Sequence, residues 1–144
     1  MRSRFNWLLV VSLLVAGCAH RRTIDVALLE SESRVTLQAI SSMEHRLIDA
    51  DLSDEEERQG LKNTRAMRRV IKLTDTMTAE LARVDMKPDD ADTFDSYLKM
   101  VYRHYYAGLQ QPAEVFAQRE VRDDDVEKWE RELNALLPRL RRLK

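Results

Sequence analysis

Residues 53–84, SDEEERQGLKNTRAMRRVIKLTDTMTAELARV, decide the fold. The start of this stretch fits a capping box, in which the Ser53 hydroxyl and the Glu56 carboxylate each accept a hydrogen bond from a free backbone amide. Its second half repeats mainly apolar residues at alternating steps of three and four, at Met67, Val70, Thr74, Met77, Leu81 and Val84. The stretch therefore predicts a long helix that begins at Ser53 and packs one face against other helices.

Two segments, one on either side, carry a similar row of mainly apolar residues along one helix face, which we call a seam. A first helix is expected over about 23–50, with an inner face at Leu29, Thr36, Ile40, Met43 and Leu47. Residues 87–90, KPDD, should then interrupt the chain. A third helix is expected over about 92–110, with an inner face at Phe94, Leu98, Val101, Tyr105 and Leu109. Gly108 and Pro112 mark its end.

The last part of the chain predicts one more helix. A connection or partial helix through Val115 and Phe116 leads to the acidic start at 123–125. The seam that follows has six members, Val126, Trp129, Leu133, Leu136, Leu140 and Leu143. Pro138 should bend this helix near Asn134, because the proline ring offers no amide to that carbonyl.

Composition agrees with an all-α fold. After residue 17 the chain has only two glycines and three prolines, and no segment alternates in the manner of a strand. Short connections between the seams predict a single antiparallel three- or four-helix bundle over residues 23–144.

The first residues have the pattern of a secretory signal. A cationic start at Arg2 and Arg4 precedes an apolar run from Trp7 to Gly17. As a helix, the segment from Trp7 to Ala19 would extend only about 20 Å, whereas a bilayer's hydrocarbon layer is about 30 Å thick. The sequence therefore predicts export rather than a membrane-spanning helix.

Residues 14–18, LVAGC, resemble the lipobox of bacterial prolipoproteins. The resemblance implies a signal peptide over 1–17, a diacylglyceryl group on the Cys18 thiol, and a short tether over 18–22. Because Ala19 rather than Asp follows the cysteine, it also implies the outer membrane of a Gram-negative envelope, facing the periplasm. The alternative is an ordinary signal cut a residue or two later. Cys18 is the only cysteine, so no intramolecular disulfide can form.

Charge argues against nucleic acid as a partner. Loss of Arg2 and Arg4 with the signal would leave 22 of the 24 basic residues against 25 acidic ones. A nucleic-acid-binding domain usually has a clearly basic face. We therefore expect no nucleic acid partner.

No motif predicts an enzyme, a metal or a cofactor. The chain has no glycine-rich phosphate loop, nucleophile elbow or Cys–His pair. The aspartates at 89–92 lack the glycine and the distal glutamate of a calcium loop, and a helix start explains them. A haem held by His45 or His104 with Met67, Met77 or Met100 is a minor alternative, because methionines at core spacing usually fill space.

Two sets of residues are candidates for binding a partner. Four tyrosines, Tyr97, Tyr102, Tyr105 and Tyr106, lie close together in the third expected helix, and one helix cannot bury all of them on one side. Tyr102 and Tyr106 are the candidates for an exposed partner surface, or else ordinary half-buried rim residues. Arg139, Arg141 and Arg142 near the chain's end either complement the helix dipole or contact an acidic partner or a lipid surface.

These features favour a non-catalytic accessory lipoprotein that is held at the membrane by lipid on Cys18. It would bind or help to assemble an envelope protein complex, and small helical lipoproteins that pilot secretion pores to the outer membrane look broadly similar in architecture. A second hypothesis is a stress chaperone or sensor that holds a client or ligand in a helical cradle. Residues 52–56, LSDEE, resemble the LTxxQ motif of small helical periplasmic stress chaperones, a motif that is itself a capping box. The haem or metal carrier is the third.

Overall fold

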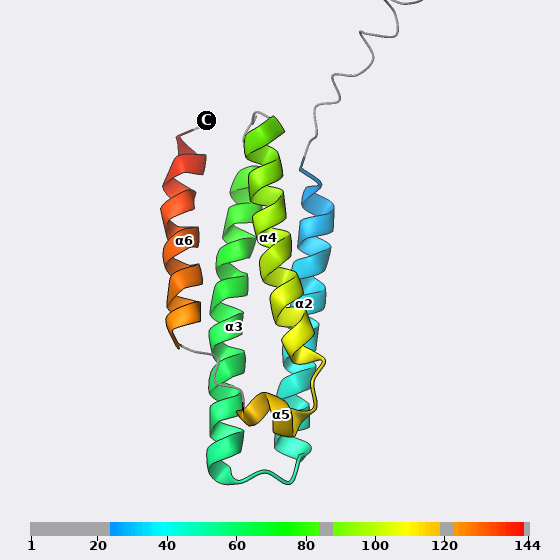
Figure 1. Ribbon diagram of the computed structural model, residues 1–144. Helices are drawn as coiled ribbons and strands as arrows, with labels where there is room; N and C mark the ends of the chain where they lie inside the picture. The colour runs from blue at the N-terminus through cyan, green and yellow to red at the C-terminus, as the bar shows by residue number, and fades with distance from the viewer. Residues whose placement is uncertain (1–23, 84–87, 119–122, 143–144) are drawn as a thin grey trace, which may run out of the picture.

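The computed structural model describes residues 24–83, 88–118 and 123–142. These residues form helices and no strand, which confirms the all-α bundle (Figure 1). The helices are α2 (Val26–Asp49), α3 (Asp54–Leu81), α4 (Pro88–Leu109), α5 (Ala113–Gln118) and α6 (Asp123–Arg141). The proposed signal peptide over 1–17 and the tether over 18–22, with Cys18, lie outside the described residues.

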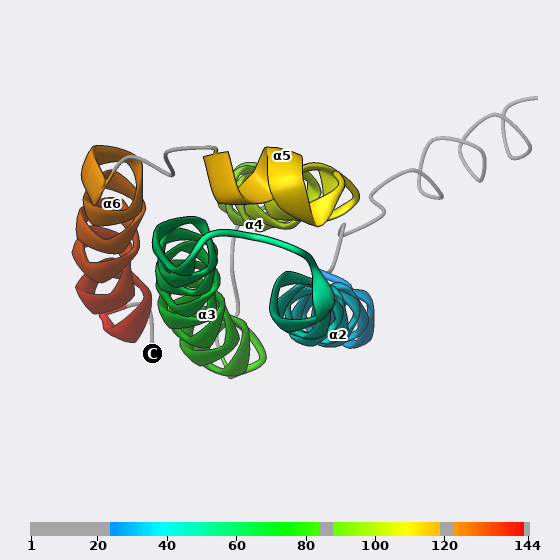
Figure 2. The same cartoon turned by 90° about the horizontal axis from the view of Figure 1, so that it is seen from below.

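The long helices alternate in direction along the chain, as the expected antiparallel bundle requires. In Figure 1, α2 and α4 run one way, and α3 and α6 run the other way. Helix α3 packs against α2 on one side and α6 on the other, while α4 packs mainly on α2 and the short α5 closes one end against α3 (Figure 2). Two pairs of helices in contact, α2 with α4 and α3 with α6, are therefore parallel, whereas α2 and α3 are antiparallel.

The seams that the sequence predicts form the core. All five predicted positions of α2, all five of α4 and the five described positions of α3 are buried. In α6, Leu133 and Leu140 are buried, whereas Trp129 and Leu136 are only partly buried. Val84, Leu143 and the side chain of Val126 lie outside the described part of the chain.

The helix starts follow local hydrogen bonding. The predicted capping box is present: Glu56 N donates to Ser53 Oγ at 3.3 Å, and Ser53 N donates to Glu56 Oε2 at 3.0 Å. Helix α2 begins at Val26, slightly later than expected, because the Asp25 carboxylate accepts the amide of Leu28 at 3.0 Å.

The start of α4 differs from the prediction. Pro88 was expected to lie in a break before a helix from about residue 92, but α4 begins at Pro88 itself. A proline is tolerated in the first turn, because an amide there would have no partner within the helix. Pro138 lies inside α6, which continues to Arg141.

Arg46 ties the end of α2 to the end of α4. Its guanidinium donates to Leu109 O at 2.6 Å and to Gln111 O at 2.9 Å. Leu109 O is a carbonyl that a helix C-terminus leaves without an internal partner, Gln111 O follows in the next turn of the chain, and a cation also complements the dipole there. One arginine thus holds the two parallel helices in register at the end where α5 packs.

Candidate binding surface between α2 and α4

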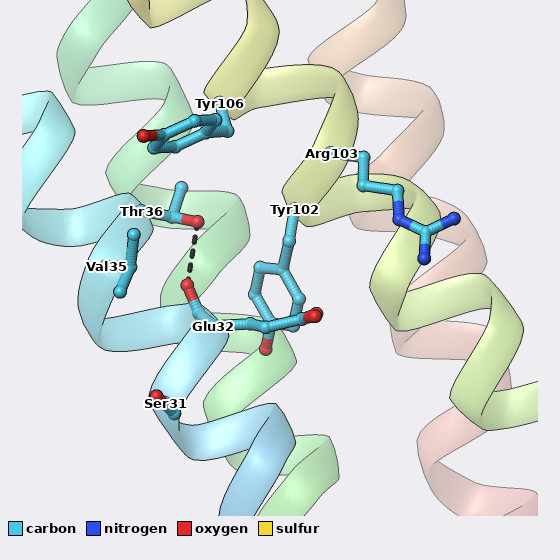
Figure 3. Close-up of a pocket in the computed structure, with 7 residues that line it drawn as sticks. All are labelled: Ser31, Glu32, Val35, Thr36, Tyr102, Arg103 and Tyr106. Atoms are coloured by element: carbon cyan, nitrogen blue, oxygen red, sulfur yellow. Dashed lines mark hydrogen bonds between the residues drawn. The ribbon is translucent and has the colours of Figure 1, made fainter.

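A groove lies between the parallel helices α2 and α4 (Figure 3). Its volume is about 210 Å³. It is lined by Ser31, Glu32, Val35 and Thr36 of α2 and by Tyr102, Arg103 and Tyr106 of α4. Both predicted tyrosine candidates therefore lie at this groove.

Tyr102 is buried, and the expectation that it is exposed is wrong. Its side chain is 3% exposed, and its hydroxyl donates to Thr74 Oγ1 of α3 at 3.0 Å. Burial raises the pKa of Tyr102, so the phenol stays neutral. The physical reason is that α4 packs on α2 and also reaches α3, so that its inner face is wide enough to bury Tyr102 as well as Tyr105. Tyr102 can contribute to the inner wall of the groove but is no exposed anchor.

Tyr106 and Val35 form an exposed apolar rim. Tyr106 is 43% exposed, as predicted, and Val35 across the groove is 45% exposed. Leu28, seven residues before Val35 and so on the same face of α2, is also exposed. Large apolar side chains gathered at a concave surface are a common feature of binding sites.

Charged groups of opposite sign lie on the two helices at the groove. Glu32 is partly buried, and its Oε2 is buried without a hydrogen-bond partner among the described residues. Arg103 is exposed and forms no ion pair within the described residues. In Figure 3 the Glu32 side chain extends from α2 toward the α4 side of the groove. A buried carboxylate oxygen without a partner is costly, so a donor supplied from outside would be stabilised there.

The arginine candidates lie elsewhere. Arg139 and Arg142 line a second cavity of about 270 Å³ together with Asp90 and Phe94 of α4. This cavity is near the start of α4, whereas Tyr106 is in its last turn. The side chain of Arg141 lies outside the described residues. The tyrosine and arginine candidates therefore do not form one surface.

The residues weighed for haem or metal are dispersed between surface and core. His45 and His104 are exposed, Met100 is 50% exposed, and Met67 and Met77 are buried in the core. His104 contacts the rings of Tyr105 and Trp129. In residues 24–83, 88–118 and 123–142, no three or more His, Cys, Asp or Glu side chains gather in a way that could hold a metal ion.

Sequence reasoning missed Glu32, Val35 and Arg103. Val35 gives a usable signal, because Leu28 and Val35 are apolar, seven residues apart and off the predicted seam. Glu32 and Arg103 give none, since their importance depends on α2 and α4 being neighbours.

The fold and this groove define a helical bundle with a candidate binding surface between two parallel helices. Comparison with protein-family models, with curated proteins and with solved structures finds no significant match for the chain. Among the described residues, no helix combines the length and apolar character needed to cross a bilayer.

Proposed function

We propose that this chain is a lipid-anchored bacterial envelope protein that acts as a non-catalytic accessory module. It binds, or helps to assemble, a larger envelope protein complex. The lipobox resemblance at residues 14–18 supports the anchor. The groove between α2 and α4 supports the binding role.

One observation carries the binding role: exposed apolar side chains line the same groove as a buried carboxylate oxygen that has no hydrogen-bond partner in the described part of the chain. The rims of Val35 and Tyr106 offer apolar area, and Glu32 Oε2 offers an acceptor. A protein segment that lays an apolar side chain between the rims and donates a hydrogen bond to Glu32 satisfies both features.

The chemistry of the lining favours binding over catalysis. Its polar side chains are two hydroxyls from Ser31 and Thr36, the tyrosine phenols, one carboxylate and one guanidinium. The Thr36 hydroxyl is already committed, since it donates to the carbonyl of Glu32 at 2.8 Å. Nucleophilic catalysis needs a base within hydrogen-bonding reach of the nucleophile. The lining contains no imidazole or thiol.

The anchor is tested by metabolic labelling with a fatty acid. We expect the wild-type protein to incorporate the label, to be processed before Cys18, and to fractionate with the outer membrane. The variant Cys18→Ser should lose all three properties. Normal processing and membrane retention of that variant would overturn the lipoprotein assignment.

The binding role is tested by photo-crosslinking in intact cells. A photoreactive amino acid at Tyr106 or Val35 should give the same discrete adduct, and Glu32→Gln should weaken it. Val115 of α5 provides the matched control, because it is 49% exposed but does not line the groove. Recovery of only an uncrosslinked monomer from both groove positions, or an equal adduct from Val115, would contradict the proposal.

A further inference from the structure

The two ends of the bundle differ in charge. Figure 1 shows the first described residues of α2, the start of α4 and the end of α6 at one end, which we call the N-terminal end. The turn from α2 to α3 and the short helix α5 lie at the other, which we call the far end. Because the two ends differ in charge, a charged surface can orient the bundle.

The far end is acidic. Its described carboxylates are Asp49, Asp51, Asp54, Glu55, Glu56, Glu57 and Glu114. Its described basic residues are engaged: Arg46 donates to carbonyl oxygens of the chain, and Arg58 pairs with Glu55 at 2.5 Å. An anionic surface would therefore repel this end.

The N-terminal end carries two arginines that are available to a ligand. Arg139 and Arg142 are exposed and line the cavity of about 270 Å³ with Asp90 and Phe94. Arg142 Nε donates to Pro138 O at 3.3 Å. Within the described residues neither arginine forms an ion pair, although Asp90 lines the same cavity.

Other charges at this end are mixed. Arg83, the last described residue after α3, is exposed. The acidic side chains are Glu80 in the last turn of α3 and Asp25, Asp89, Asp90 and Asp92, which belong to the starts of α2 and α4. The positive ends of these helix dipoles offset part of that negative charge. Among the described residues, the cationic groups of this end are thus Arg83 and the arginine pair, and the pair lines a cavity.

We propose that Arg139 and Arg142 bind the phosphate groups of anionic phospholipids and so hold the N-terminal end of the bundle against the membrane. The orientation rests on the proposed lipid anchor. Cys18 lies six positions before Ile24, and six residues span at most about 21 Å. An anchored chain therefore keeps this end of α2 close to the bilayer surface.

The chemistry of arginine suits the phosphate group. A guanidinium presents a planar set of donors that can engage two phosphate oxygens at once, and it is weakly hydrated compared with an ammonium. The Phe94 ring in the same cavity offers an apolar surface beside the headgroup. With Arg139 and Arg142 toward the lipid, the acidic far end points away from the anionic surface.

The test is vesicle flotation of the chain after residue 17 with Cys18→Ser, so that the result does not depend on lipidation. Vesicles contain phosphatidylethanolamine with phosphatidylglycerol, or phosphatidylcholine alone. We expect binding to the anionic vesicles only, weaker at high salt. The double variant Arg139→Gln with Arg142→Gln should bind about 25-fold more weakly, since each basic residue near an anionic surface contributes about fivefold.

Matched variants and a fold control make the test specific. Arg58→Gln, at the far end, should leave vesicle binding unchanged. All variants should keep the helical circular dichroism of the parent, because the altered side chains are exposed. Equal vesicle binding by the double variant, or binding to phosphatidylcholine alone, would overturn the proposal.

Two further results would reassign the arginines. If the protein binds inorganic phosphate through these arginines but does not bind vesicles, the cavity would be assigned to free phosphate. If the arginine double variant loses the crosslinked adduct at Tyr106 or Val35 in cells but binds vesicles as the parent does, the arginines would be assigned to an acidic protein partner. Failure of fatty-acid labelling leaves the vesicle measurement intact, so failure of the anchor and failure of the arginine site are distinguishable.

Discussion

Helix α3 is packed on its two sides in different ways. On the α2 side, Ile40, Met43 and Leu47 are completely buried, and Leu47 lies opposite Gly60 of α3. Toward α6, Leu133 and Leu140 are buried, but Trp129, Leu136 and Leu137 are only partly buried. Both helices present regular apolar seams, so the difference lies in how completely each seam is covered.

Polar contacts repeat this contrast. Between α2 and α3, Arg68 donates to both carboxylate oxygens of Glu44, at 2.7 and 3.1 Å, and both side chains are about one-third exposed or less. Between α3 and α6, the pair of Arg69 and Glu130 is at 3.1 Å, but Arg69 is 61% exposed. Solvent screening leaves an exposed pair with little effect on stability. We infer that α2 and α3 form the stable part of the bundle and that α6 is the more weakly held helix.

The largest expected effect of a single change is at Leu47. Leu47→Ala removes a fully buried side chain and should lower the free energy of unfolding by about 3 kcal/mol. Leu136→Ala in α6 should cost about 1 kcal/mol, because that side chain is only partly buried. Urea denaturation measures both, with Ile48→Ala, at a 59% exposed position, as the control. Equal losses for Leu47→Ala and Leu136→Ala would remove the contrast between the helices.

Gly60 provides a second test of the close packing of α2 on α3, because the absence of a side chain there lets the two helices approach closely. A Cβ at position 60 would lie 2.6 Å from Leu47 Cδ2. Leu47 is fully buried and its side chain has little room to move away. Gly60→Ala should therefore destabilise the protein by about 1 kcal/mol, with the overpacking cost exceeding the gain in helix propensity. In the Leu47→Ala background the clash is gone, and the same change should stabilise by up to about 1 kcal/mol. Additive effects in this double-mutant cycle would mean that the helices do not meet at Gly60.

Much of the fold follows from the sequence, because the seams are local patterns. The steps of three and four in residues 67–81 place those side chains on one face wherever the helix docks, and the Ser53 capping box needs only residues 53–56. The start of α4 was missed because a proline breaks a helix interior but fits a first turn, and sequence alone does not separate the two positions at Pro88.

The candidate site was harder to predict. The burial of Tyr102 depends on contact between α4 and both α2 and α3, and the groove depends on α2 and α4 lying parallel. The sequence pattern of a single helix does not show which other helices it contacts. Gly60 shows the same limit, because its role is visible only when Leu47 lies opposite it.

A smaller effect is expected from the ion pair between α2 and α3. Hydrogen bonds from Arg68 lower the pKa of Glu44. A carboxylate whose folded pKa is lowered contributes stability that is present above its unfolded pKa, about 4.3, and is lost as the pH falls through the folded value. Glu44→Gln should therefore lower the free energy of unfolding by about 1 kcal/mol at neutral pH. Below about pH 4 the difference in this free energy between the variant and the wild type should become smaller. Urea denaturation across this pH range measures this difference, and a difference that does not change with pH would show that it does not come from the ionised carboxylate of Glu44.

The smallest effect at neutral pH concerns the contact that joins α4 to α6. The Tyr97 ring lies 5.6 Å from that of Trp129, and its hydroxyl donates to Glu132 Oε2 at 2.5 Å. Burial and this hydrogen bond raise the pKa of Tyr97, so its contribution to stability is present below the unfolded pKa and is lost progressively above about pH 10. Tyr97→Phe should lower the free energy of unfolding by about 0.5 kcal/mol near pH 8. Above pH 10 the variant should lose less of this free energy than the wild type does. Tyr102, whose pKa is also raised, is common to both proteins and cancels. If the two proteins lose equal stability in alkali, α6 is not held through Tyr97.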